Sequence, residues 1–267
     1  MARIGLLAGS GKLPSIFARS AMEKGDTVIA FGLKGITDET IEKDVTKLHW
    51  LEWGNLQKAL LLLAMERIGS VVMLGKLKKD MFFKNDAVLD EKASAILKKV
   101  GDRKDSVIFD EASKALAKIG IKIIDSAAYL KDLIPQKGVI TKRRPTDAEQ
   151  EDIKYGSDIA KKLAGFDIGQ ALVIKNKTVI AVETIEGTDE TIGRAGKLTE
   201  GGFTVVKMAR PDQDMRFDVP AIGIDTVNSI VRAKGSALAL ESGKMFLLDR
   251  DEIIKLADSH NISIVII

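Results

Sequence analysis

Short apolar runs that alternate with amphipathic stretches constrain the fold of this chain more than any other feature of its sequence. The runs 4–8, 27–31 and 71–74 are aliphatic, and each is followed by glycine or polar residues. The segments between them have the length and patterning of helices. Strands and helices in alternation predict a parallel sheet covered by helices on both faces, which is a Rossmann-like, doubly wound α/β domain.

A change of pattern divides the chain near its middle. Residues 135–146 contain two prolines and a run of basic side chains, and the alternation lapses there. Such composition is typical of a boundary between domains. We therefore predict a Rossmann-like nucleotide- or phosphate-binding domain over residues 1–134, a linker over 135–146, and a C-terminal mixed α/β domain with acidic catalytic motifs over 147–267.

The composition excludes several kinds of site. The chain contains no cysteine and two histidines, which rules out disulfides, thiolate nucleophiles and multi-histidine metal sites. Its 41 basic and 38 acidic residues give a net charge of +3, which argues against a nucleic-acid partner. The sequence has no targeting segment or long apolar stretch, so we expect a cytoplasmic protein.

The first candidate site is the turn after the first predicted strand, Gly9-Ser10-Gly11-Lys12-Leu13-Pro14. Glycines let backbone amides approach a phosphate at a helix amino terminus. The turn lacks the ending of a P-loop, and Pro14 stands where a dinucleotide site requires a small residue. No acid follows the second strand, which further disfavours a nicotinamide cofactor. We predict phosphate or nucleotide binding, with a tight strand-to-helix turn as the alternative.

The second candidate site is Gly75-Lys76, at the end of the run 71–74, with Lys78 and Lys79 beyond it. Ligands of open α/β sheets lie at the carboxyl ends of the strands. These residues therefore predict substrate contact, and a basic surface loop is the alternative.

The third candidate site crowds acidic and polar side chains around Gly187. It contains Glu183, Glu186, Thr188 and Asp189, at the junction of a predicted strand and helix. Carboxylate oxygens are the ligands that Mg²⁺ prefers, often shared with substrate phosphates. The alternative is helix capping by Thr188 or Asp189.

The fourth candidate site lies between prolines and contains Gln213, Asp214, Arg216 and Asp218. In an extended segment, alternate residues share a face, so we expect the two acids and the arginine to align. Carboxylates beside a guanidinium suit phosphoryl chemistry, because they hold metal and water while the arginine binds phosphate oxygens. The alternative is a solvated loop with surface ion pairs.

Together these motifs resemble the UDP-2,3-diacylglucosamine pyrophosphatase family of lipid A biosynthesis, of the type unrelated to calcineurin-like phosphoesterases. The matching stretches run in order along both halves of the chain: 5–14, 167–170, 181–183, 186–189, 194–195 and 213–223. The resemblance implies Mg²⁺-dependent hydrolysis of UDP-2,3-diacylglucosamine to UMP and 2,3-diacylglucosamine 1-phosphate (lipid X). Separately from the resemblance, the basic run Lys142-Arg143-Arg144 suits anionic lipid headgroups, so we expect transient contact with the surface of the inner membrane, with a solvated linker as the alternative.

The resemblance and the motifs assign roles to particular residues. We expect catalysis by Asp214, Asp218, Arg216, Glu183 and Arg194, and metal binding by Asp214, Asp218 and Asp189. We expect substrate binding by Gly9, Ser10, Gly11, Leu13, Pro14, Gly75, Lys76, Gln170, Glu186, Gly187, Thr188 and Gln213.

Two other functions remain open from the sequence. One is a different nucleotide-sugar enzyme, such as a dehydrogenase or transferase, on the same kind of domain. The other is a non-catalytic regulator that binds a nucleotide-linked lipid. The sequence predicts no oligomeric state.

Overall fold

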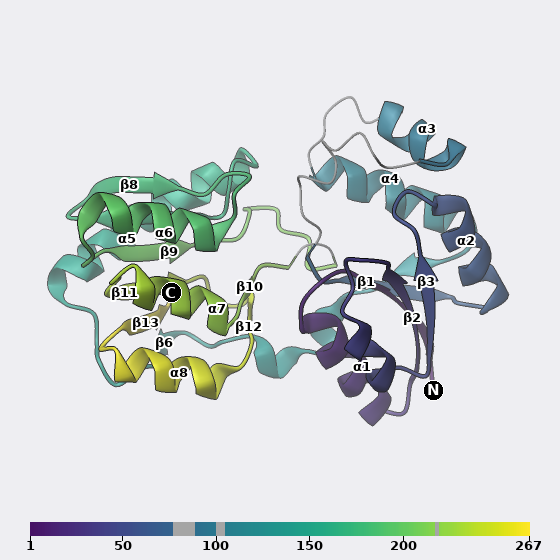
Figure 1. The fold of residues 1–267 in the computed structure, drawn as a ribbon, viewed down its shortest axis with the longest axis horizontal. Helices are drawn as coiled ribbons and strands as arrows, with labels where there is room; N and C mark the ends of the chain where they lie inside the picture. The colour runs from purple at the N-terminus through teal and green to yellow at the C-terminus, as the bar shows by residue number, and fades with distance from the viewer. Residues whose placement is uncertain (77–88, 100–104, 217–218) are drawn as a thin grey trace. The chain divides into compact units, whose positions relative to one another are not determined.

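A computed structural model of the chain describes residues 1–76, 89–99, 105–216 and 219–267. Two compact units divide these residues between them (Figure 1). The first contains residues 1–131 and the described part of the segment that begins at Asp214, and the second contains the rest. Lys78, Lys79 and Asp218, which the sequence patterns singled out, lie outside the described residues.

The first unit alternates strands and helices as expected. Its regular elements are β1 (Arg3–Ala8), α1 (Leu13–Glu23), β2 (Thr27–Leu33), η1 (Glu39–Asp44), β3 (Lys47–Leu51), α2 (Leu56–Met65), β4 (Ser70–Leu74), α3 (Glu91–Lys99), α4 (Asp105–Ala117), β5 (Lys122–Ile123) and η3 (Ser126–Ala128). Asn55 caps α2 by accepting a hydrogen bond from the backbone of Lys58, which accounts for where this helix begins.

The strands of the first unit form one sheet in the order β3-β2-β1-β4-β5, and every pair is parallel. The chain leaves β1 toward β2 and later returns to the other side of β1 to form β4. Right-handed crossovers in these two directions place α1 and α2 on opposite faces of the sheet. The predicted doubly wound parallel domain is therefore confirmed, and its topological switch point lies between β1 and β4.

The second unit begins near the middle of the chain. Its regular elements are η4 (Lys131–Leu133), which overlaps the boundary, then β6 (Gly138–Val139), α5 (Asp147–Gly165), β7 (Ala171–Lys175), β8 (Thr178–Val182), α6 (Thr188–Thr199), β9 (Thr204–Lys207), β10 (Ala221–Ile222), α7 (Ile224–Arg232), β11 (Ala237–Leu240), β12 (Phe246–Leu247), α8 (Arg250–Ser259) and β13 (Ser263–Ile266).

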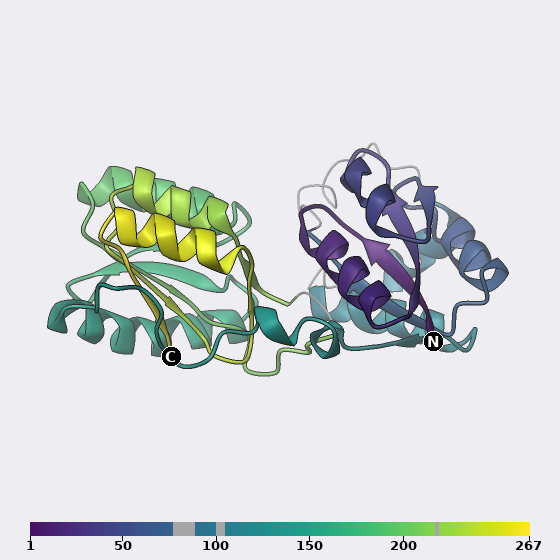
Figure 2. The same cartoon turned by 90° about the horizontal axis from the view of Figure 1, so that it is seen from below.

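The main sheet of the second unit is mixed, with strand order β6-β13-β11-β9-β7-β8. The strands β13, β11 and β9 are parallel, and β7 runs against β9 and β8. Helix α5 covers one face, and α6, α7 and α8 cover the other (Figure 2). The predicted mixed α/β architecture is therefore confirmed.

Local chemistry accounts for two features of the second unit. Asn176 and Lys177 both have positive φ, at 50° and 59°, as a two-residue hairpin turn requires between β7 and β8. Thr146 and Glu149 form a capping box at the start of α5, where each side chain accepts a hydrogen bond from the other's backbone N–H.

The basic run within residues 135–146 is built into the second unit. The guanidinium of Arg143 binds both carboxylate oxygens of Glu149 at 2.8 Å and donates to the carbonyl oxygen of Asn261. The hydroxyl of Thr141 accepts a hydrogen bond from the backbone of Ile264 in β13. Arg143 is therefore a partly buried side chain that links segments within the second unit.

One pairing differs from the sequence expectation. The segments 237–240 and 245–248 suggest two strands about the turn at Ser242 and Gly243, but β11 and β12 belong to different sheets. Strand β12 pairs with β10 in a small parallel sheet.

Among the described residues, none of the helices combines the length and apolar character needed to span a bilayer.

Candidate active site

The switch point of the first unit is joined by backbone hydrogen bonds. Ser10 and Lys76 exchange N–H···O bonds of 3.0 and 2.9 Å, and Gly9 donates to the carbonyl oxygen of Leu74 at 2.7 Å. A Cβ atom on Gly75 would lie 2.6 Å from the carbonyl carbon of Gly9. Only glycine allows so close an approach, so the first two predicted sites form one structure at the carboxyl edge of this sheet.

These backbone hydrogen bonds determine which parts of the turn remain available to a ligand. The amides of Gly9 and Ser10 already donate within the protein, whereas Gly11 has a φ of +93° and open space on its Cβ side. Leu13 and Pro14 are buried, so their side chains support the turn from the core instead of lining a site. Gly11 and the amino end of α1 are therefore the parts that a phosphate can approach.

Asp214 and Arg216 form a close ion pair in the segment that belongs to the first unit. Arg216 donates from Nη2 to Asp214 Oδ2 at 2.6 Å and from Nε to Oδ1 at 3.0 Å. The Arg216 guanidinium lowers the pKa of the Asp214 carboxyl, and the Asp214 carboxylate raises the pKa of Arg216. The carboxylate therefore remains ionised and is presented together with a fixed cation.

The way these two side chains meet differs from the expected extended alignment. The backbone turns at Met215 and Arg216, and the backbone N–H of Arg216 donates to Asp214 Oδ1 at 3.0 Å. A short side-chain-to-backbone bond of this kind is a turn that aspartate stabilises locally. The expected alignment assumed an extended chain, and the turn at Met215 and Arg216 replaces it.

Two further acids of the first unit lie within electrostatic reach of Arg216. Asp110 in α4 and Asp125 after β5 both raise the pKa of its guanidinium. The sequence patterns did not single out either residue. Asp125 could have been found, because it follows a strand at the same edge of the sheet as Gly9 and Gly75.

The carboxyl edge of the second unit brings together residues from three segments. Glu183 follows β8, Gln170 precedes β7, and Thr188 begins α6. Glu183 accepts from the Thr188 hydroxyl at 2.8 Å and from the Gln170 backbone N–H at 3.2 Å. Gly169 permits this contact, since a Cβ there would lie 2.0 Å from the carbonyl oxygen of Glu183.

Lys207 joins the same network, and the sequence patterns did not identify it. It is the last residue of β9, it is 8% exposed, and its Nζ donates to the Thr188 hydroxyl at 2.9 Å. A charged residue that ends the buried run Thr204–Lys207 is a usable signal, because lysine is almost never fully buried without a reason.

Asp189, a predicted metal ligand, has a structural partner. Its carboxylate accepts a hydrogen bond of 2.8 Å from the hydroxyl of Thr226, which lies in α7. This bond links the first turns of α6 and α7. Gln213, which was predicted to bind substrate, is buried. It belongs to the second unit, and the next residue, Asp214, belongs to the first.

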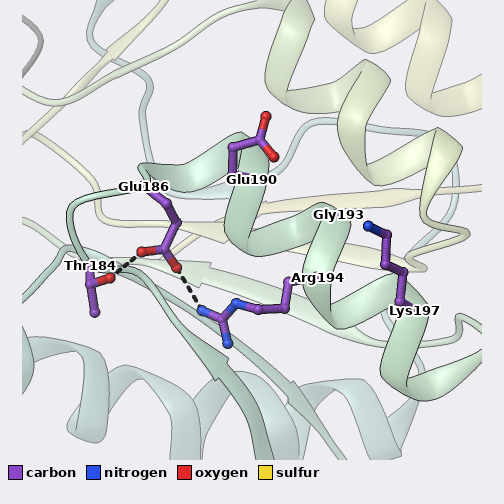
Figure 3. A pocket seen from close by; sticks show the side chains of 6 residues that line it. All are labelled: Thr184, Glu186, Glu190, Gly193, Arg194 and Lys197. Carbon is purple, nitrogen blue, oxygen red and sulfur yellow. Dashed lines mark hydrogen bonds and ion pairs between the residues drawn. The ribbon is translucent and has the colours of Figure 1, made fainter. Parts of the chain in front are cut away.

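A surface pocket of about 580 Å³ lies along α6 (Figure 3). Arg194 points back from the helix to Glu186 and donates to its Oε1 at 2.7 Å and to the carbonyl oxygen of Val182 at 2.9 Å. Glu186 also accepts from the hydroxyls of Thr184 and Thr191. The Thr184 hydrogen bond and Arg194 lower the pKa of the Glu186 carboxyl to about 2. Arg194 and Glu186 thus hold the loop before α6.

The predicted residues therefore fall into two groups. The first unit contains Gly9, Ser10, Gly11, Gly75, Lys76, Asp214 and Arg216, and the second contains Gln170, Glu183, Glu186, Gly187, Thr188, Asp189 and Arg194. Among the residues that the structure describes, no group of three or more acidic or histidine side chains is arranged to hold a metal ion. The cations and helix amino termini of this arrangement suit an anionic ligand, and the carboxylates suit a cation bound together with it.

The parallel sheet with a glycine-built switch point, followed by a mixed α/β unit with an acid–lysine edge, defines a two-unit α/β protein. Models of two protein domains match almost the whole chain: the LpxI N-terminal domain over residues 3–133 and the LpxI C-terminal domain over residues 136–265. The chain belongs to the LpxI family.

A curated relative supports this membership. The UDP-2,3-diacylglucosamine pyrophosphatase LpxI of Caulobacter vibrioides is 26% identical over 97% of this chain and 95% of its own length. Among solved structures, an N5-carboxyaminoimidazole synthetase from Staphylococcus aureus is 14% identical, with a TM-score of 0.26, and the match covers 65% of this chain and 38% of that one. A glycinamide-RNase-transformylase T from Mycobacterium tuberculosis is also 14% identical, with a TM-score of 0.26 and coverage of 68% and 44%. These two likenesses are too low to support any argument about function.

Proposed function

We propose that this chain hydrolyses the pyrophosphate bond of UDP-2,3-diacylglucosamine and releases UMP and 2,3-diacylglucosamine 1-phosphate in lipid A biosynthesis. The observation that supports this most is the family match in both halves of the chain, together with the relative that bears this activity in its name. In the reaction, the oxygen of water bonds to one phosphorus, the bond from that phosphorus to the bridging oxygen breaks, and both products leave as phosphate monoesters.

In this proposal, residues of the first unit bind the nucleotide pyrophosphate and carry the chemistry. Gly11 and the amino end of α1 present N–H donors to a phosphate, and Lys76 adds a positive charge at the same edge. Arg216 neutralises negative charge that develops on the phosphate oxygens. Asp214, which Arg216 holds in place, accepts a proton from the attacking water.

The proposed roles in the second unit concern orientation. Glu183, fixed by Thr188 and the backbone of Gln170, presents an ordered carboxylate at the sheet edge. Arg194 and Glu186 hold the loop that contains Gly187. An ordered loop limits the motion of a bound substrate, which lowers the entropic cost of reaching the reactive geometry. The substrate carries acyl chains, so we also propose transient contact with the surface of the inner membrane.

We propose Mg²⁺ as the cofactor. Asp214 and Asp218 supply the oxygen donors that this ion prefers, and Mg²⁺ is commonly held by one or two carboxylates together with substrate phosphates. A bound Mg²⁺ would withdraw charge from the phosphoryl oxygens. Asp189, which belongs to the second unit, accepts a hydrogen bond from Thr226 through one carboxylate oxygen.

The test is UMP release from UDP-2,3-diacylglucosamine by the purified full chain, with Mg²⁺ and with a chelator. Metal-dependent release of UMP together with 2,3-diacylglucosamine 1-phosphate supports the proposal. Substrate that binds and is recovered intact in the presence of Mg²⁺ would instead identify a non-catalytic binder.

A further inference from the structure

Lys207 carries a positive charge into a nearly buried position. The residue is 8% exposed, and its ammonium donates to the neutral hydroxyl of Thr188 at 2.9 Å. Among the described residues, Lys207 makes no ion pair with a carboxylate. A buried ammonium without a direct counter-ion is unfavourable, because it has lost its hydration without gaining an equivalent partner.

The hydroxyl of Thr188 leaves part of the ammonium available. This hydroxyl donates its single proton to Glu183 Oε1 at 2.8 Å, so it meets Lys207 as an acceptor. The order of donors therefore runs from Lys207 to Thr188 to Glu183, and it fixes the direction of the ammonium. Glu183, one hydroxyl away, offsets only part of the charge, and the other N–H groups of Lys207 remain for a further acceptor.

The surroundings of this ammonium also favour an anion. Thr188 is the first residue of α6, whose N-cap position is Gly187 and has no side chain to cap the helix. Free N–H groups and the helix dipole give this end a partial positive charge. Asp189, in the same turn, uses a carboxylate oxygen to accept from Thr226. Asp189 and Glu190 in this first turn offset part of that positive charge, and Lys207 adds a cation beside it through its hydrogen bond to Thr188.

We propose that Lys207 is a phosphate-binding residue, oriented by Thr188 and Glu183, that holds a phosphoryl oxygen of the substrate at the carboxyl edge of the second unit. The ligand class is a pyrophosphate or a phosphate monoester. The identity of the natural ligand rests on the proposed function. The binding site itself rests on the buried charge, its neutral partner and the uncapped helix.

The experiment measures binding of inorganic pyrophosphate to the full chain by calorimetry, alongside thermal unfolding without ligand. Lys207→Met removes the charge and keeps the apolar stem, and we expect pyrophosphate affinity to fall roughly 10- to 100-fold. The unfolding temperature without ligand should stay the same or rise, because a buried charge is replaced by an apolar group. A purely structural lysine would give the opposite result, with lower stability and unchanged anion affinity.

Two further variants keep the test decisive. Lys207→Gln keeps a donor for Thr188 but removes the charge. It should show the same loss of pyrophosphate affinity, and it takes the place of Lys207→Met if that variant does not fold. Lys175→Met is the matched control, since Lys175 also ends a strand of this sheet but donates to the carbonyl oxygens of Thr199 and Gly201. It should bind pyrophosphate like the wild type.

The outcomes separate this inference from the proposed function. The inference is overturned if the wild type and Lys207→Met bind pyrophosphate equally, or if neither binds it. It is also overturned if Lys175→Met loses as much pyrophosphate affinity as Lys207→Met. Loss of pyrophosphate binding in Lys207→Met supports it, even where the wild type releases no UMP and the hydrolase proposal fails. In an active enzyme, Lys207→Met should raise KM for the substrate more than about tenfold.

Discussion

The two units place their polar residues at the same kind of position, the carboxyl edge of a sheet, but they build that edge differently. In the first unit, backbone bonds between Ser10 and Lys76 join two loops, and glycines at 9 and 75 allow the approach. In the second unit, side chains of Glu183, Thr188 and Lys207 form a hydrogen-bonded series. An edge built from backbone is sensitive to any added Cβ atom, whereas an edge built from side chains is sensitive to changes of charge.

The largest expected effect concerns the ion pair of Asp214 and Arg216, which comes late in the chain but belongs to the first unit. Asp214→Asn removes the charge that Arg216 binds and the proposed proton acceptor, so kcat for UMP release should fall roughly 10²- to 10³-fold. Circular dichroism should remain that of the wild type. Asp212→Asn, two residues away and exposed, is the control and should change kcat by less than about twofold. A wild-type rate in Asp214→Asn would remove the catalytic role from this pair.

The next effect tests the backbone-built edge directly. Gly75→Ala places a Cβ within 2.9 Å of three backbone atoms of Gly9 at a φ of +100°, so we expect a loss of about 3 kcal/mol in the free energy of unfolding. Gly11→Ala has a similar φ of +93° but meets no atom within 4 Å, so it should cost only about 1 kcal/mol. Denaturant unfolding measures both. Equal losses would mean that backbone strain, and not the close approach, makes Gly75 necessary.

A smaller effect concerns the opposite edge of the first unit's sheet. Glu66 binds Lys47, His49 and Arg3, and the hydrogen bonds from Lys47 and His49 lower the pKa of its carboxyl from 4.5 to about 2. Since the folded-state pKa lies below the ordinary value, the stabilisation is complete above pH 4.5 and is lost as the pH falls toward 2. Because Arg3 and Lys47 are about half exposed, we expect only about 1–2 kcal/mol from Glu66→Gln at pH 7.

The pH profile checks this interpretation. The difference in unfolding free energy between the wild type and Glu66→Gln should shrink steadily below pH 4.5. A difference that stays constant down to pH 2.5 would assign the loss to packing instead of charge. This edge contains no proposed substrate ligand, so UMP release at pH 7 should not change.

The smallest stability effect is expected at the exposed pair of Arg194 and Glu186. Arg194→Gln should lower the free energy of unfolding by less than about 1 kcal/mol, because both side chains are partly in solvent. Its effect on turnover separates two roles. A change in kcat/KM that Glu186→Gln reproduces indicates loop positioning, and a much larger loss in Arg194→Gln alone indicates direct contact with the substrate.

Much of the fold followed from local patterns in the sequence. Buried strands such as β1 and β4 are continuous aliphatic runs, which only a sheet covered on both faces accommodates. The start of α5 at Thr146 and the turn at Asn176 depend on neighbouring residues alone. Signals of this kind act within a few residues, so the sequence predicts them without knowledge of the tertiary structure.

Local patterns predicted the candidate site less fully. The sequence singled out Asp214 and Arg216, but it suggested an extended alignment where a local hydrogen bond forms a turn. It did not single out Asp125, which reaches Arg216 only through the fold. It also placed Leu13 and Pro14 among the binding residues, although both side chains are buried.

The sequence by itself determined the alternation of strands and helices, the two α/β halves and the motifs that match the LpxI family. The tertiary structure decided that Ser10 pairs with Lys76, that Asp214 belongs to the first unit, and that Lys207 reaches Thr188. The physical reason is distance along the chain. Helix caps and turns depend on near neighbours, whereas these contacts join segments brought together only when the sheets form and bury their apolar faces.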